Sequence, residues 1–189
     1  AVGTEVTFFV NAATFLAPAA ALWSIRTRGA PTAASQGVLS LLRAGAPAFR
    51  WVVVGDGPLA EDLRGRVLAE ALPVVVAGRR DDVPELNRAA SVVVSTSTWE
   101  GQPLAVQEAL QAGAAVVATD VGGTREVTGD AAVLTPPDPG ALAAAITGLL
   151  TDPDRRERLR VAARARADQL PTPADVLDQL RSVYAGVRR

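Results

Sequence analysis

Cysteine, histidine and lysine are all absent from this sequence of 189 residues, so each of its 19 basic residues is an arginine. Without cysteine the chain can form no disulfide and no thiolate metal site, and without histidine it lacks the commonest metal ligand and general base. Catalysis by this chain therefore depends on carboxylates, arginines and backbone dipoles, and we expect no bound metal.

An excess of charge of either sign is missing as well. The 20 acidic residues balance the 19 basic ones to a net charge of −1 at pH 7, and the isoelectric point is about 5.5. Because nucleic-acid binding needs a basic surface, we expect no nucleic acid as a partner. Hydrophobic residues make up 49% of the chain, which excludes disordered and fibrous proteins.

One apolar run, Val6–Trp23, resembles a membrane span but is unsuited to be one. It contains Asn11 and Pro18, follows Glu5 instead of a basic cluster, and has barely the length that a spanning helix needs. We therefore expect it to lie in a soluble core, with no transmembrane segment. The expected location is cytoplasmic, with peripheral contact at the inner face of the membrane as the alternative.

Short β-rich runs alternate with helical runs along the rest of the chain. This alternation predicts an α/β domain over residues 1–189, with a doubly wound parallel sheet that is Rossmann-like and has strand order 3-2-1-4-5-6. The C-terminal residues 153–187 are expected to be helical, with their charges on a solvated face. Val6–Val10 is a further candidate strand before these. The six expected strands are Ala21–Ile25, Arg50–Val54, Pro73–Ala77, Ser91–Ser95, Ala114–Thr119 and Ala131–Thr135.

The stretch from Ser91 to Gly113 organises the chain. Its first five residues read as a buried strand, Pro103 suits the first position of a helix, and Gly113 suits the end of that helix. The loop Thr96–Gln102 therefore lies at the carboxyl end of a central strand, where open α/β sheets bind ligands.

Two glutamates and the first N–H groups of the helix are the candidate ligand-binding groups of this stretch. Glu100 lies in the loop, and Glu108 lies in the second helical turn, where a carboxylate can accept hydrogen bonds from a ribose diol. The backbone N–H groups of Leu104, Ala105 and Val106 carry the positive end of the helix dipole and are expected to be free for a phosphate.

This segment, Glu100-Gly101-Gln102-Pro103-Leu104 followed by Glu108-Ala109, resembles the Glu-x7-Glu motif of retaining nucleotide-sugar glycosyltransferases with the GT-B fold, of the group 1 type. The resemblance covers Val52 to Tyr184 and is strongest from Ser91 to Glu126. It implies the C-terminal, donor-binding half of a hexosyltransferase, with a nucleotide-diphosphate sugar as substrate, no cofactor and no metal. The acceptor domain that precedes this half in the family is expected to be absent, and efficient transfer is expected to need it.

The resemblance also assigns roles to residues. Glu100 contacts the donor sugar, Glu108 the ribose, and Gly78 and Arg79 the nucleotide base. The diphosphate contacts are Gln102, Pro103, Leu104 and Ala105, and Gly101 is a further donor-binding residue.

A second diphosphate contact is implied in the loop Arg26–Gly37. The family has an arginine there, which Arg26 or Arg28 matches, and we assign Arg28 to catalysis beside Glu100. Where relatives have Lys-Gly this chain has Gln36-Gly37, and where they have Pro-Ser it has Thr96-Ser97.

Several alternatives stay open. The segment from Asp120 to Glu126 resembles the family's Gly-Gly-x-x-Glu, and its paired glycines either approach a ligand or a neighbouring loop closely or form a simple turn that Thr124 caps. Asp81 or Asp82 is expected to cap a short helix that begins near Pro84 and ends by Ala90. The missing lysine favours a degenerate, non-catalytic binding domain as the alternative function. A nicotinamide site is not expected, because no Gly-x-Gly-x-x-Gly follows the predicted first strand.

Overall fold

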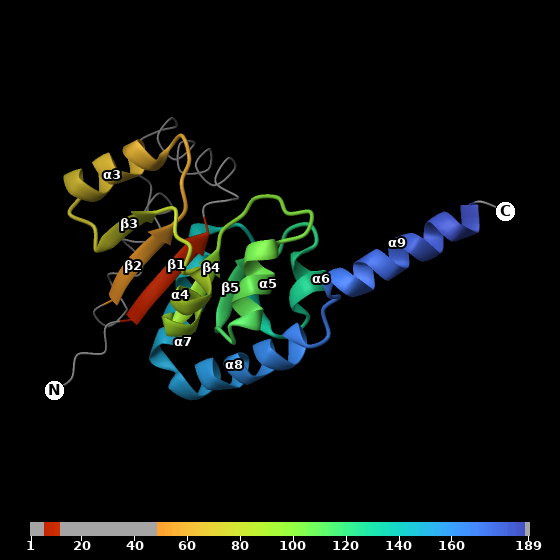
Figure 1. The fold of residues 1–189 in the computed structure, drawn as a ribbon. Coiled ribbons are helices and arrows are strands. Elements are labelled where there is room, and N and C mark those ends of the chain that lie inside the picture. Colours follow the sequence, from red (N-terminus) through yellow and green to blue (C-terminus); the bar gives the residue numbers. More distant parts are fainter. Residues whose placement is uncertain (1–5, 12–48, 188–189) are drawn as a thin grey trace.

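The computed structural model describes residues 6–11 and 49–187, with the side chains of residues 49–186. These residues form a six-stranded parallel sheet in the order β3-β2-β1-β4-β5-β6, flanked by helices (Figure 1). The predicted α/β, doubly wound class is therefore confirmed. The strands are β1 (Val6–Asn11), β2 (Phe49–Val54), β3 (Val74–Gly78), β4 (Val92–Ser95), β5 (Val116–Thr119) and β6 (Ala132–Thr135).

The central place in the sheet belongs to β1, which pairs in parallel with β2 and β4. The sequence predicts Ala21–Ile25 for this place, and that segment lies outside the described residues. Val6–Val10, expected only as an additional strand, occupies it instead. Both segments are short apolar runs, and periodicity alone does not show which run enters the middle of a sheet.

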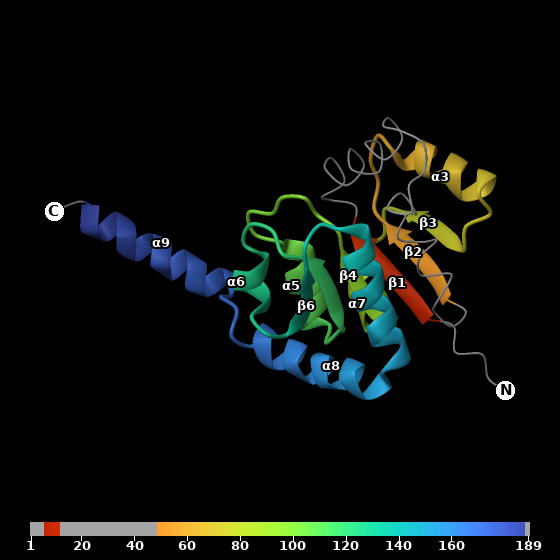
Figure 2. The same cartoon turned by 180° about the vertical axis from the view of Figure 1, so that it is seen from behind.

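Helices cover both faces of the sheet. Figure 1 shows α4 and α5 on one face, and the reverse view in Figure 2 shows α7 on the other. No helix of the described residues is both long and apolar enough to cross a bilayer. The helices are α3 (Ala60–Ala69), α4 (Val83–Ala89), α5 (Leu104–Gln111), α6 (Thr124–Thr128), α7 (Pro139–Thr151), α8 (Pro153–Ala167) and α9 (Pro173–Val187).

Two hydrophobic cores sandwich β4, whose side chains are all buried. Val92 and Val94 pack in the core that contains Ile146 of α7, and Val93 packs in the core that contains Leu110 of α5. Alternate side chains of a strand point to opposite faces, so a continuous β-branched run suits a strand that is covered on both sides. This burial fixes the carboxyl end of β4, from which the candidate site begins.

The end of α5 is as predicted, and its beginning is not. Gly113 has a φ of +67°, its N–H donates to Leu110 O, and the next N–H, of Ala114, donates to Ala109 O. These two bonds form a Schellman motif, which needs a residue with positive φ. Pro103, however, precedes the helix with a ψ of 83° instead of being its first helical residue. The helix starts at Leu104.

The arginines of α8 correct the prediction of a wholly solvated charged face. Arg156 donates to the carbonyls of Leu149 and Leu150 near the end of α7, at 2.7 and 2.8 Å. Arg166 donates to two carbonyls of α6 in the same way. The last carbonyls of a helix have no partner within it, so guanidinium groups satisfy them and favour the negative end of the dipole. Helix α9 instead projects from the body of the molecule (Figures 1 and 2).

Candidate functional site

The loop between β4 and α5 holds its glutamate through a buried serine. Ser97 is 1% exposed, and its hydroxyl donates to the Glu100 carboxylate at 2.6 Å. The Ser97 carbonyl in turn accepts a hydrogen bond from the hydroxyl of Thr119 on β5. Glu100 is thus half-buried and oriented by its own loop. Thr96-Ser97 departs from the family's Pro-Ser only in its first residue, so the hydroxyl that positions Glu100 is present.

The paired glycines lie against this same loop. The Gly123 N–H donates to Glu100 O at 3.0 Å. A Cβ at Gly122 would lie 1.8 Å from Glu100 O, and one at Gly123 would lie 2.2 Å from Gly101 O. No side chain fits at such distances, so the glycine pair exists for close approach to a neighbouring loop, one of the alternatives that the sequence leaves open.

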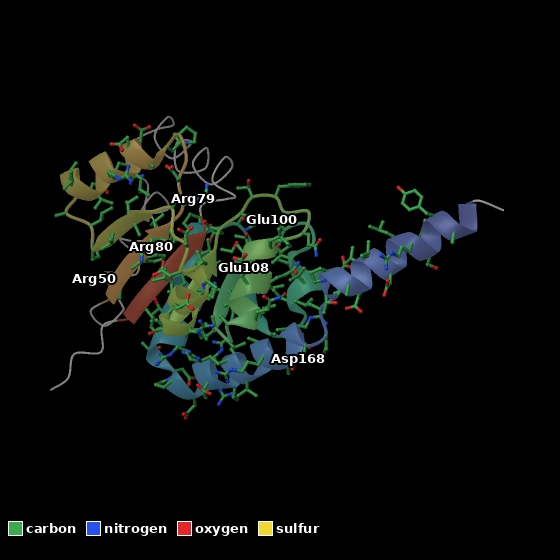
Figure 3. The ribbon with its side chains drawn as sticks, viewed as in Figure 1. Arg50, Arg79, Arg80, Glu100, Glu108 and Asp168 are labelled. Atoms are coloured by element: carbon green, nitrogen blue, oxygen red, sulfur yellow. The ribbon has the colours of Figure 1, made fainter. Side chains whose placement is uncertain are left out.

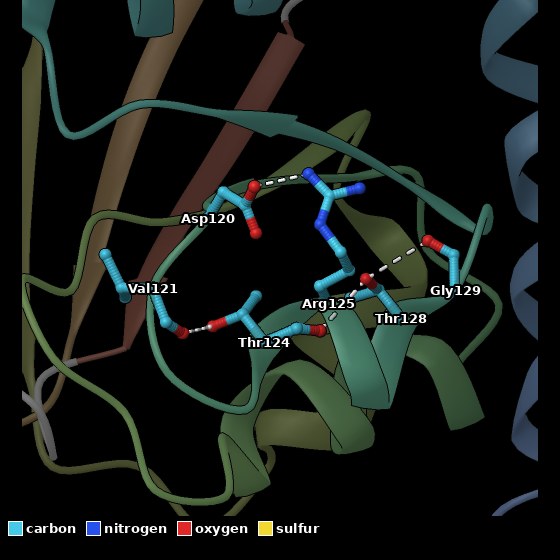
Figure 4. Close-up of polar contacts among 6 residues, drawn as sticks. All are labelled: Asp120, Val121, Thr124, Arg125, Thr128 and Gly129. Atoms are coloured by element: carbon cyan, nitrogen blue, oxygen red, sulfur yellow. Dashed lines mark hydrogen bonds and ion pairs between the residues drawn. The ribbon is translucent and has the colours of Figure 1, made fainter.

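Figure 4 shows the turn that carries these glycines into α6. Thr124 does not cap the helix as one prediction has it. Its hydroxyl donates to Val121 O at 2.7 Å, and the N-cap position belongs to Gly123. Arg125 pairs with Asp120, which raises the pKa of Arg125 through the hydrogen bond and the opposite charge. The side chains of Thr124 and Arg125 thus bond to groups within the turn itself. The glycines of the turn lie against the Glu100 loop.

Free backbone donors lie at the start of α5. Among the described residues no side chain caps this helix, and the N–H groups of Leu104 and Ala105 have no acceptor. Val106 differs from the prediction, because its N–H donates to Pro103 O at 3.0 Å. Two of the three predicted donors are thus free to receive an anion, and the positive end of the helix dipole adds to their effect.

Figure 3 shows Glu100 on the loop above α5, Glu108 on α5 itself and Arg79 at the end of β3. Glu108 is exposed in the second turn, and its carboxylate makes no hydrogen bond within the described part of the chain. Gln102 is exposed and Pro103 is buried. The predicted residues Arg26 and Arg28, and Gln36-Gly37, lie outside the described residues. No group of three acidic side chains in the described ranges has the arrangement of a metal site.

A pocket of about 280 Å³ opens beside this helix start. Ala105 and Val106 of α5 line it together with Arg79, so one predicted base contact lies next to a predicted diphosphate contact. Gly78 does not line the pocket, but its carbonyl accepts from the N–H of Gly55, which does. Glu100 and Glu108 are not among the lining residues either. The pocket therefore does not include the two predicted glutamates.

Two arginines at this pocket differ in their partners. Arg80 pairs with Asp82 at 2.6 Å, and the shared hydrogen bonds raise the pKa of Arg80 and lower the pKa of Asp82. The Asp82 carboxylate therefore pairs with Arg80 instead of capping α4, although Asp82 stands at the N-cap position as predicted. Arg79 has no carboxylate partner among the described residues, so its guanidinium is available to a ligand.

Sequence reasoning missed part of the pocket. Gly55 and Asp56 follow β2 and read as a structural turn, yet both line the cavity. Asn87 on α4 also lines it and is 4% exposed. Its only sequence signal is a single amide in a short helix, which does not by itself indicate a site.

Comparison with known proteins identifies the family. Residues 33–152 match the family model described as "Glycosyl transferases group 1". The chain is 34% identical over 39% of its length to the UDP-Gal:alpha-D-GlcNAc-diphosphoundecaprenol alpha-1,3-galactosyltransferase of Escherichia coli, covering 20% of that protein. It is 40% identical over 55% of its length to the D-inositol 3-phosphate glycosyltransferase of Thermomonospora curvata, covering 25% of it.

Solved structures share the fold. The sucrose-phosphate synthase of Thermosynechococcus elongatus superposes on 99% of this chain with a TM-score of 0.72 and 25% identity, over 46% of its own length. Anabaena HepE in complex with UDP-glucose superposes on 97% with a TM-score of 0.75 and 23% identity, over 49% of its length. The chain thus spans half or less of each of these four proteins. It belongs to the glycosyl transferases group 1 family, and its fold matches part of the GT-B glycosyltransferases.

Proposed function

We propose that this chain binds the nucleotide-diphosphate sugar of a glycosyltransferase that transfers the sugar with retention of configuration and without a metal. One observation carries the proposal. The Glu100 carboxylate is hydrogen-bonded by buried Ser97 in a loop that the Gly122-Gly123 backbone braces, immediately before a helix whose first N–H groups are free. A fixed carboxylate beside unoccupied amide donors suits a ligand that has both hydroxyl groups and negative charge.

The diphosphate would occupy the start of α5. The N–H groups of Leu104 and Ala105 would donate to its oxygens, and the helix dipole would favour its charge. The same donors would stabilise the charge that builds up on the departing nucleotide diphosphate, which is an electrostatic route to catalysis. We propose that Arg26 and Arg28 add positive charge there, with Arg28 catalytic.

The sugar and the nucleoside of the donor would lie on either side of the diphosphate at the start of α5. Glu100 would accept hydrogen bonds from hydroxyls of the sugar, and Glu108 from the ribose. Gly78 and Arg79 would contact the base, beside the pocket that Arg79 and Ala105 line. One named relative uses a UDP-sugar, and one structural neighbour holds UDP-glucose. Uridine donors are therefore the first to test.

The ribose assignment is tested by Glu108→Ala. Loss of a charged hydrogen-bond acceptor is expected to weaken binding of UDP by roughly 1–3 kcal/mol, measured by isothermal titration calorimetry. Gln111→Ala is the matched control, because Gln111 is exposed on the last turn of the same helix. An unchanged dissociation constant in Glu108→Ala contradicts the ribose role. Absence of binding of UDP, GDP and ADP and their sugars to the unaltered chain contradicts the proposed function itself.

A further inference from the structure

An exposed aromatic side chain lies next to the proposed catalytic glutamate. Trp99 immediately precedes Glu100 in the β4–α5 loop, and its side chain is 73% exposed. The described aromatic residues of the sheet are packed instead: Trp51 is 5% exposed, and its ring lies edge-on against Phe49. Tryptophan contributes to stability and binding through its large apolar surface, so an indole that remains in water on a binding loop is available to a ligand.

The indole of Trp99 has a defined place on this loop. Its six-membered ring lies over Gly101, where a Cβ would be 3.4 Å from Cη2 and 3.9 Å from Cζ3 of the ring. The Gly101 carbonyl in turn lies against Gly123, in the turn that braces the loop. The ring therefore rests on backbone that the fold holds in place, and most of its surface is open to solvent.

Trp99 and Glu100 are neighbours with different surroundings. The Glu100 carboxylate is half-buried and hydrogen-bonded to buried Ser97 at 2.6 Å, whereas the indole is exposed. In the proposed donor complex the sugar lies at Glu100 and the diphosphate at the start of α5, so the bond that breaks in the transfer lies between them. Gly101 lies between them in the chain as well. An indole over Gly101 is thus at the solvent side of that bond, from which an acceptor has to approach.

We infer that Trp99 is a specificity-determining residue for the acceptor and that this acceptor presents a sugar ring; the inference rests on the proposed function. One face of a hexopyranose is rich in C–H groups, which match the electron-rich face of an indole. Its hydroxyls point outwards from the rim and stay free. One hydroxyl oxygen would bond to the anomeric carbon of the donor while the bond from that carbon to the diphosphate breaks, and the hydroxyl proton would leave with the diphosphate.

The surroundings of the ring favour a sugar over a lipid chain as its occupant. A lipid chain needs apolar surface on several sides, and Trp99 does not line the pocket that the valines beside α5 form. A flat ring that is open to water suits a ligand with one apolar face and a hydrated rim.

Binding of small glycosides to the full chain with saturating UDP tests the inference. The probes are the methyl α- and β-glycosides of glucose, galactose, mannose and N-acetylglucosamine. We expect at least one of them to bind, measured by saturation-transfer NMR, with the largest signals on the C–H protons of one ring face. Trp99→Ala should weaken this binding at least fivefold. Trp99→Phe keeps an aromatic face and should weaken it less than threefold.

Two further measurements separate stacking from a general effect on the loop. UDP and UDP-glucose should bind to Trp99→Ala as they bind to the unaltered chain, because the indole contacts no proposed part of the donor. Tyr184→Ala is the matched control, since Tyr184 is an exposed aromatic residue on the projecting helix α9 (Figure 1). It should leave glycoside binding unchanged.

The possible outcomes distinguish the inference from the proposed function. If UDP binds and none of the glycosides does, the inference is overturned and donor binding stands. The inference is also overturned if n-hexanol, a probe for a lipid acceptor, binds through Trp99 in place of the glycosides. The same holds if Trp99→Ala weakens UDP-glucose, which shows a donor contact, or weakens every ligand equally, which shows support of the loop. If the unaltered chain binds no nucleotide diphosphate, the proposed function fails, and the inference fails with it.

Discussion

At the scale of single residues, the side chain that matters most beside the predicted glutamates is Ser97. Its hydroxyl donates to Glu100 at 2.6 Å, and its backbone carbonyl is held by Thr119, which is 22 positions away in the sequence. Ser97 touches no proposed part of the donor. It acts through the carboxylate that it orients, so it is a positioning residue.

Ser97→Ala is expected to weaken the binding of the sugar part of the donor. Without the hydroxyl, Glu100 loses the bond that fixes its orientation, which for a charged acceptor is worth about 1.5–3 kcal/mol. The affinity for UDP-glucose should therefore fall towards that for UDP, while UDP itself binds unchanged; calorimetry with both ligands measures this. Thr98→Ala in the same loop is the control, because Thr98 is exposed. Equal losses for the two ligands would show that Ser97 supports the loop in general and not the carboxylate.

At the scale of elements, two loops that are far apart in the sequence form one unit. The turn before α6 donates from Gly123 to Glu100 O and packs its glycines on the backbone of the β4–α5 loop. A Cβ at Gly122 would overlap Glu100 O, so the loop that carries the proposed catalytic carboxylate keeps its place only if this position has no side chain. The turn between β5 and α6 therefore supports the Glu100 loop, and no ligand contact is proposed for the turn itself.

Gly122→Ala is expected to reduce binding of UDP-glucose at least tenfold, because the new methyl group displaces the Glu100 loop. Gly129→Ala separates this effect from backbone strain. Both glycines have a φ of +51°, but the nearest atoms to a Cβ at Gly129 are 3.7 Å away. Both variants should lose stability in urea unfolding, because a side chain at positive φ is strained, and only Gly122→Ala should lose donor binding. Equal donor affinity in the two variants would contradict a link between the glycine pair and the site.

At the scale of the whole molecule, the sequence predicts those elements that are determined by neighbouring residues in the chain. The β-branched run before Ser95 and the helix end at Gly113 depend on neighbours in the chain, and both are where the sequence places them. The neighbour of Gly122 is Glu100, and the place of Asn87 at the pocket wall is visible only once α4 lies over the sheet. Such contacts depend on packing between distant segments, which no local pattern encodes. The local structure of the segment from Ser91 to Gly113 was therefore largely predictable, and the contacts that support it were not.

Truncation at helix α9 tests whether this helix contributes to the stability of the rest of the domain. Every side chain described in α9 is exposed, and the hydrogen bonds of Asp175 and Arg181 stay within the helix and its first cap. Removal of residues 171–189 should therefore change the free energy of urea unfolding by no more than about 0.5 kcal/mol and leave UDP affinity as it was.

Removal of residues 152–189 is the informative comparison. It also takes away α8, whose Ala163 is fully buried in the core with Leu110 of α5 and whose Arg156 and Arg166 bond the carbonyls of α7 and α6. This shorter chain is expected to lose cooperative unfolding, because it exposes core surface and leaves the ends of two helices unsatisfied. If the first truncation costs as much stability as the second, α9 packs on the body in solution. If neither costs stability, the arginine contacts of α8 contribute nothing to the fold.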